Sequence, residues 1–266
     1  MLNDTQLKVL VDFENFSDCF QGVDIAGGVC YFLRDKSYAG LCEVTTVNGI
    51  NRITQPRDLS QSTTFVRNAD SDRIRIIIEN QVTDFLNSKV SSQKPFGLRT
   101  YVVPTEEGDL ILRYNQGKGP FKRELVPSKT EWIDKWKVIT SYRTNEHAGQ
   151  TDRDGRKRIL STTEILAPSE ICTETYIVVN TVSTEVEAQN VLRYLKTRFV
   201  RFLISIRTST QTLSKKNFDK VPLQDFTVAS DIDWTQPIEN IDQQLYAKYG
   251  LQEYIEFIEN TVRPME

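Results

Sequence analysis

The 266-residue chain is predicted to adopt a mixed α+β fold. Three short apolar runs of strand length lie near the N-terminus, at 7–11, 29–33 and 40–47, and the last of them is rich in β-branched residues. Further along, apolar residues recur at helical spacing over 184–207 and 238–262. We therefore expect a short N-terminal β unit, a linker helix, a central domain with a long amphipathic helix, and a C-terminal helical pair.

The three N-terminal runs are followed by one predicted helix. Small residues at 26–28 precede the second run, where they permit a bulge or a close backbone approach; phosphate binding by the two glycines is the weaker interpretation. Asp70 or Ser71 can cap the helix, and Pro95 excludes a helical continuation. One apolar stripe defines that helix: Ile74, Ile77, Ile78, Val82, Phe85 and Leu86.

The central part is expected to consist of strands and basic loops. Residues 98–103 and 110–114 have strand character, and the segment between them, which contains Pro104 and Gly108, predicts a hairpin. Glycines mark two charged stretches as loops, 115–123 and 151–158. The other elements expected here are a short helix at 131–137 and strands at 137–141 and 173–181.

The longest helix is predicted from about Thr184 to Arg207, with Arg193 and Arg201 pointing away from its apolar face. Two consecutive amphipathic helices follow near the C-terminus, the first of them ended by Gly250.

Charge is distributed unevenly although the net charge is only −3. Residues 113–158 contain twelve Lys and Arg against six Asp and Glu, and residues 190–220 contain eight against one. Acidic stretches separate and follow these blocks, at 159–189 and 221–266. Such asymmetry favours a polyanionic partner, although ordinary solvated faces are an equally good explanation.

Few residues are available for catalysis. The only histidine, His147, lies in a polar stretch typical of a loop, and no glycine-rich phosphate loop of the G-x-G-x-x-G or G-x-x-x-x-G-K type occurs. The paired acids and acid-x-Lys of metal-dependent nucleases are absent or degenerate around Glu106, Glu107 and Asp134. We expect no chemistry from this chain by itself.

The four cysteines form no C-x-x-C pair, so we expect no zinc site and interpret them as reduced, mostly buried thiols. No apolar run has membrane-spanning length and the N-terminus does not resemble a secretory signal, so a cytoplasmic location without membrane contact is predicted.

Loop cations are the best candidates for binding a nucleic acid, since they attract phosphates and can enter a groove. The neighbouring aromatic residues, such as Trp132 and Trp136, are better explained by core packing. The candidate DNA-binding residues are Lys118, Lys122, Arg123, Arg143, Arg153, Arg156, Lys157, Arg158, Lys215 and Lys216.

Several segments together resemble the C-terminal half of adenine-specific DNA methylases of restriction-modification systems. The segments are VDIAGGVCYFL at 23–33, KPFGL at 94–98, KTRFVRFL at 196–203, KVPLQDF at 220–226, and DWT at 233–235 with IDQQLYAKYGL at 241–251.

The resemblance implies the tail of a methyltransferase sheet at 1–50, a linker helix region at 51–97, a DNA target recognition domain at 98–226 and a helical cap at 227–266. The family's Asn/Asp-Pro-Pro-Tyr/Phe turn is absent, because none of the nine prolines is followed by another. S-adenosylmethionine would therefore be bound by the rest of a longer parent enzyme, and no cofactor is expected here.

The implied partners are double-stranded DNA and either the missing methyltransferase core or a second copy, contacted through residues 7–47, because a sheet without its earlier strands leaves an edge uncovered. Two alternatives stay open. The chain could be an interaction or specificity subunit that recruits a catalytic chain through the acidic helices at 238–262, or, less favourably, a nuclease.

Overall fold

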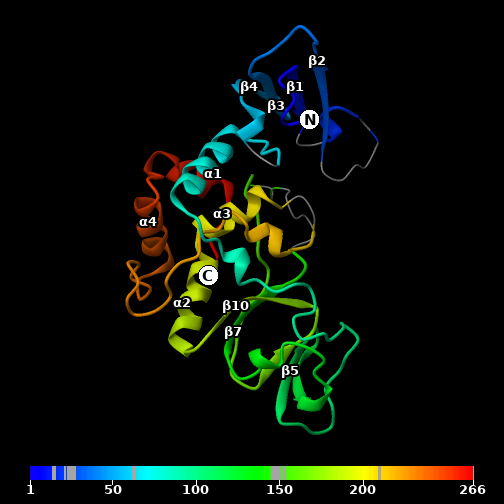
Figure 1. Cartoon of the computed structure of the whole chain (residues 1–266), viewed down its shortest axis with the longest axis vertical. Coiled ribbons are helices and arrows are strands. Elements are labelled where there is room, and N and C mark those ends of the chain that lie inside the picture. The colour runs from blue at the N-terminus through cyan, green and yellow to red at the C-terminus, as the bar shows by residue number, and fades with distance from the viewer. Residues whose placement is uncertain are drawn as a thin grey trace. The chain divides into compact units, whose positions relative to one another are not determined.

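The computed structural model divides the chain into two compact units, Met1–Ile76 and Ile77–Glu266 (Figure 1). Among the described residues there are mixed sheets and five α-helices, so the predicted α+β class is confirmed. The boundary between the units falls within helix α1 (Ala69–Gln81). The structure describes residues 1–13, 16–20, 22, 28–61, 64–144, 151, 154–208 and 211–265.

The first unit contains a four-stranded sheet in the order β2-β1-β3-β4. The two central strands, β1 (Leu7–Phe13) and β3 (Cys42–Asn48), are parallel, whereas β2 (Val29–Arg34) and β4 (Asn51–Arg57) run antiparallel to their neighbours. The three predicted strands are confirmed. The prediction missed β4, because it lies at the edge with most of its side chains exposed and therefore has no apolar alternation.

Both faces of this sheet are apolar. One cluster contains Leu10 and Val44, with Leu59 from a short 3₁₀ turn (Leu59–Gln61) packed against them. The other cluster contains Val11, Phe13 and Val47. Because successive residues of a strand point to opposite faces, adjacent residues of β1 contribute to two separate cores.

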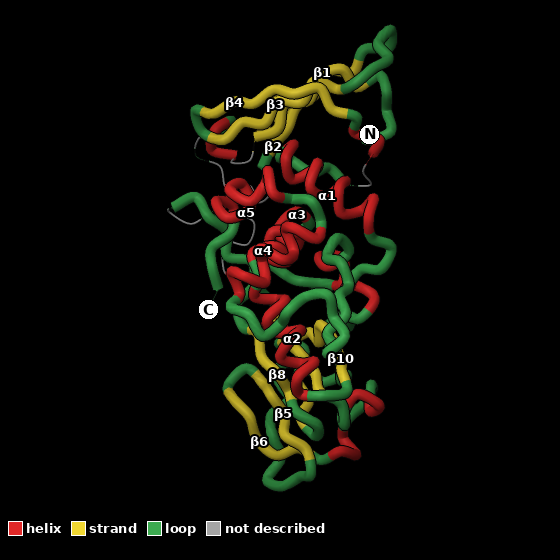
Figure 2. Tube along the Cα trace, turned by 90° about the vertical axis from the view of Figure 1, so that its left-hand side faces the viewer, coloured by secondary structure: helices red, strands yellow, loops and turns green. Residues whose placement is uncertain are grey.

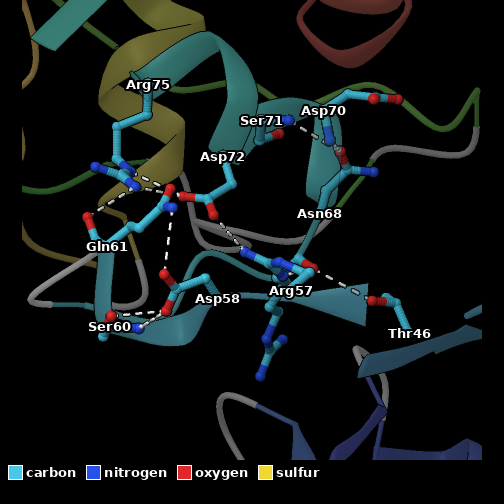
Figure 3. Close-up of polar contacts among 11 residues, drawn as sticks. Thr46, Arg57, Asp58, Ser60, Gln61, Asn68, Asp70, Ser71, Asp72 and Arg75 are labelled. Atoms are coloured by element: carbon cyan, nitrogen blue, oxygen red, sulfur yellow. Dashed lines mark hydrogen bonds and ion pairs between the residues drawn. The ribbon is translucent and has the colours of Figure 1, made fainter. Parts of the chain in front are cut away.

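Buried charges connect β4 to the first turns of α1. Asp72 accepts from Arg57 Nη2 at 2.7 Å through one carboxylate oxygen and from Arg75 Nε at 2.8 Å through the other (Figure 3). Arg75 also donates to the carbonyl of Gln61, and the Asn68 side chain accepts from two main-chain N–H groups at the start of the helix. Each charge thus has a partner, as buried ionic groups require.

Two three-stranded sheets form part of the second unit. One has the order β10-β7-β8 and the other β6-β5-β9. They share an apolar core that includes Leu112 from β5, Ile139 from β7 and Val178 from β10. The strands are β5 (Leu110–Tyr114), β6 (Gly117–Phe121), β7 (Trp136–Ser141), β8 (Thr163–Leu166), β9 (Glu170–Cys172) and β10 (Tyr176–Val182).

The hairpin differs from the predicted one. Residues 98–103 form turns, and β5 pairs instead with β6, which the prediction treated as a loop. Gly119 of β6 faces Pro104 so closely that a Cβ there would lie 2.6 Å from the proline ring, so the residue interpreted as a loop signal permits close packing. The helix expected at 131–137 is only a 3₁₀ turn (Thr130–Trp132) before β7.

The single long helix predicted over 184–207 is wrong. The structure has α2 (Glu185–Lys196) and α3 (Arg198–Ile206), separated by Thr197 in an extended conformation. The Thr197 hydroxyl accepts from Val200 N at 3.2 Å, and Asp242 accepts from the main-chain N–H groups of Arg198 and Phe199 at 2.9 Å. These caps favour a new helix start over continuation.

The two C-terminal helices are confirmed as α4 (Ile238–Lys248) and α5 (Ile255–Thr261), joined through a 3₁₀ turn at Gln252–Tyr254. Within this unit the helices α3, α4 and α5 lie at one end and the β5–β6 hairpin at the other, with α2 and β10 between them (Figure 2). Aromatic rings pack the helical end: Tyr194, Phe199, Phe226, Trp234, Tyr246 and Tyr249.

Helix α1 ends at Gln81, five residues before the predicted stripe does. The chain beyond it pairs with 221–223: Leu86 N donates to the Val221 carbonyl at 2.8 Å, and Leu223 N donates to the Asp84 carbonyl at 2.9 Å. Tertiary pairing of the main chain therefore overrides the helical pattern there.

Candidate nucleic-acid interface

The predicted DNA-binding residues separate into two groups within the second unit. Lys118, Lys122 and Arg123 belong to the β5–β6 hairpin and the turn after it, which we call the hairpin region. The others that the structure describes lie toward the helical end, and Arg153 lies outside the described residues. The structure therefore does not bring all ten candidates to one surface.

Carboxylates already neutralise the cations of the hairpin region. Lys118 Nζ lies 3.0 Å from Glu164 Oε1 and 2.9 Å from Glu170 Oε1, and Arg113 Nε lies 2.7 Å from Glu164 Oε2. Burial opposes the charge of Lys118, but hydrogen bonds to the two glutamates outweigh it, so its pKa is raised.

The turn after β6 is paired in the same way. Arg123 contacts Asp109 at 3.1 Å and Asp134 at 2.9 Å, and hydrogen bonds to these two carboxylates raise its pKa. Lys122 Nζ lies 3.5 Å from Glu107 Oε1. Residues 98–134 contain six Lys and Arg and six Asp and Glu, so this end of the unit has no excess of positive charge.

A second set of cations lies where three segments run side by side. Main-chain bonds pair 142–144 with 211–213, including Leu213 N to the Tyr142 carbonyl at 2.8 Å and a bridge between Arg143 and Thr212. On the other side, Ser161 Oγ donates to the Arg143 carbonyl at 3.2 Å. The main chain of Arg143 therefore lies between the segment that follows Arg158 and the one that precedes Lys215, and its side chain is exposed.

Lys215 and Lys216 begin a short 3₁₀ turn (Lys215–Phe218) that packs against α3. Asn217 holds the turn, because its Oδ1 accepts from Ser214 N at 2.8 Å and its Nδ2 donates to the Arg207 carbonyl at 3.1 Å. Both lysine side chains are exposed, and neither forms an ion pair within the part of the chain that the structure describes. Rigid main chain thus presents two adjacent positive charges to solvent.

The C-terminal segment holds the main chain of Lys157. Lys157 N donates to the Thr261 carbonyl at 2.8 Å, and Arg263 N donates to the Lys157 carbonyl at 3.2 Å. Arg263 also contacts Asp154 at 2.7 Å. Since side chains alternate along an extended segment, Arg156 and Arg158 project to the side opposite Lys157.

We call these six cations the basic region: Arg143, Arg156, Lys157, Arg158, Lys215 and Lys216. Only two acids accompany them in 141–144, 154–163 and 211–219. Asp154 is bonded to Arg263, and Asp219 to Arg207 at 2.8 Å. In contrast to the cations of the hairpin region, Arg143, Lys215 and Lys216 are exposed and have no carboxylate partner among the described residues.

Two further cationic side chains are buried. Arg201 was predicted to point away from the core, but it is 2% exposed and donates to the Thr197 and Arg263 carbonyls. Burial lowers its pKa to about 10. Lys137 of β7 is fully buried, donates to the Ile133 carbonyl at 2.7 Å, and has its pKa lowered to about 8 by burial. Neither can serve a surface site.

The remaining predictions concern cysteines, metals and membranes. Cys42 and Cys172 are buried but Cys19 and Cys30 are exposed, so the thiols are not mostly buried. Over the described ranges, no group of three His, Cys, Asp or Glu side chains is arranged to hold a metal ion. No helix in those ranges is long and apolar enough to cross a membrane. His147, Ala26 and Gly27 lie outside them.

No protein-family model and no curated protein matches the chain.

Proposed function

We propose that the chain binds double-stranded DNA through the basic region, as the recognition part of an adenine-specific DNA methylase of a restriction-modification system. One observation carries the proposal of DNA binding: Arg143, Lys215 and Lys216 are exposed, lie on adjoining segments and have no carboxylate partner among the described residues. The assignment to a methylase is supported by the sequence resemblance alone.

The chemistry fits backbone contacts. Lysine and arginine side chains on a rigid surface neutralise phosphates and release condensed counterions, which fixes the position of the protein on the duplex without reading its sequence. Arginines at 143, 156 and 158 can in addition form two hydrogen bonds to the edge of a guanine. Positioning the duplex, rather than methyl transfer, is the role proposed for this chain, since it lacks the catalytic turn.

The test is a salt titration of duplex binding with charge-matched variants. The logarithm of the binding constant should fall with log salt at about −0.9 per phosphate contacted, and Lys215→Gln/Lys216→Gln should lower that slope by about 2. The control is Lys122→Gln/Lys129→Gln, which removes the same charge from lysines that lie near Glu107 and Glu131. A flat titration, or equal losses in the two variants, would contradict the proposal.

A further inference from the structure

The two edges of the sheet in the first unit differ in how they are protected. The exposed edge strand β4 carries Arg52, Pro56 and Arg57, and charges and proline are features that prevent strand addition. The other edge, β2, consists of the sequence VCYFLR, which has five uncharged residues in succession and no proline. Only one edge of the sheet is therefore blocked against a further strand.

The side chains of β2 are exposed on both faces. Tyr31 is 56% exposed, Phe32 54% and Leu33 53%, although β1 pairs with the whole strand on its inner side. Tyr31 and Leu33 extend the face that contains Val11, and Phe32 extends the face that contains Leu10. Monomeric proteins rarely leave such a continuous apolar strand uncovered.

We propose that β2 is an association surface for a second copy of this chain, whose own β2 adds to the free edge in antiparallel orientation. Like residues then meet across a two-fold axis, as in most homodimers. This inference does not rest on DNA binding, since it concerns the first unit alone.

The charges of β2 permit this pairing. In an antiparallel pair, the main-chain N–H and C=O groups of two directly opposite residues both point toward the partner strand or both away from it. Because these directions alternate along a strand, a two-fold symmetric pair must place one residue directly opposite its own copy. The two registers with the fullest overlap are centred on Tyr31 or Phe32, which places an aromatic ring opposite its own copy. Arg34 then lies opposite Gly28 or Cys30, and it already contacts Asp4 at 2.7 Å, so no like charges oppose each other.

Sedimentation velocity tests the proposal with the full chain and two variants. Phe32→Lys places a charge in β2, whereas Ile50→Lys makes the matched change at a fully exposed position in the turn between β3 and β4. The wild type and Ile50→Lys should shift from monomer to dimer between about 1 and 100 µM, and Phe32→Lys should stay monomeric over that range.

Far-UV circular dichroism of Phe32→Lys should match that of the wild type, and thermal unfolding should match at about 1 µM, where both chains are monomeric, because Phe32 is 54% exposed. A wild-type chain that stays monomeric throughout, or association that Phe32→Lys leaves intact, would overturn the proposal. A monomer that still binds DNA with the expected salt dependence would overturn this inference while leaving the proposed function in place.

Discussion

The hairpin region and the basic region contain similar residues but differ in what surrounds them. Lys118, on β6, lies between Glu164 of β8 and Glu170 of β9, two acids that come from a stretch of sequence more than forty residues away. Arg143 lies on a segment that pairs with the one directly before Lys215, and the described residues 141–144 and 211–218 contain no acid. The availability of a cation for a ligand is therefore decided by which distant strands the fold places beside it.

The largest effect is expected from reversing the charge of the basic region. Arg143→Glu/Lys215→Glu/Lys216→Glu removes three proposed phosphate contacts, which should weaken duplex binding roughly 100-fold at about 0.15 M salt. Fluorescence anisotropy with a labelled duplex measures this loss, and unchanged thermal unfolding shows that the fold is intact. If Lys118→Glu/Lys122→Glu/Lys129→Glu weakened binding as much, the distinction between the two regions would be broken.

Lys137 is a fully buried cation that has no carboxylate partner among the described residues. Burial lowers the pKa of Lys137 to about 8, so the folded chain binds fewer protons than the unfolded chain between pH 8 and its ordinary pKa of 10.5. Lys137 therefore destabilises the folded state below pH 8, and this destabilisation decreases by about 3 kcal/mol as the pH rises through the window.

Lys137→Met should therefore stabilise the protein at pH 7 by about 1 to 2 kcal/mol and remove this rise in stability at alkaline pH. Urea unfolding of both proteins at pH 7, 8, 9 and 10 measures the difference. A variant that is less stable at pH 7 and shows the same pH dependence as the wild type would contradict the assigned cause.

A smaller effect is expected when one of the acids that neutralise Lys118 is removed. Glu170→Gln removes one of the two carboxylates on Lys118, while the amide oxygen can still accept from Ala167 N. Duplex affinity should rise about two- to fivefold at low salt, because one positive charge is less neutralised. An affinity that does not change would show that the hairpin region lies too far from bound DNA to contribute.

Sequence patterns predicted those parts of the fold in which local and tertiary preferences agree. Strands β1, β2 and β3 and helices α4 and α5 follow apolar patterns and are confirmed. The break at Thr197 was missed because Asp242, a residue 45 positions later in the chain, supplies part of the cap of α3. Strand β6 was missed because one of its glycines, Gly119, permits close packing against Pro104 rather than a turn.

The candidate site, too, depends on contacts between distant segments that the sequence does not reveal. Arg143, Lys215 and Lys216 are adjacent only because of the pairing between 142–144 and 211–213, which no local pattern announces. Counting charges along the sequence overestimated the hairpin region, since the strands that neutralise it lie in the next acidic block. Glu170 lies beside Lys118 because its strand, β9, pairs with β5, and no local pattern in the sequence indicates this pairing.

Lysine footprinting tests the contrast between the two regions most directly. The chain is acetylated with and without a saturating duplex, and the modification of each lysine is measured by mass spectrometry. Lys215 and Lys216 should be protected by DNA, whereas Lys118, Lys122 and Lys129 should react equally in both samples. Protection of Lys118, Lys122 and Lys129 with unchanged reactivity at Lys215 and Lys216 would contradict the account.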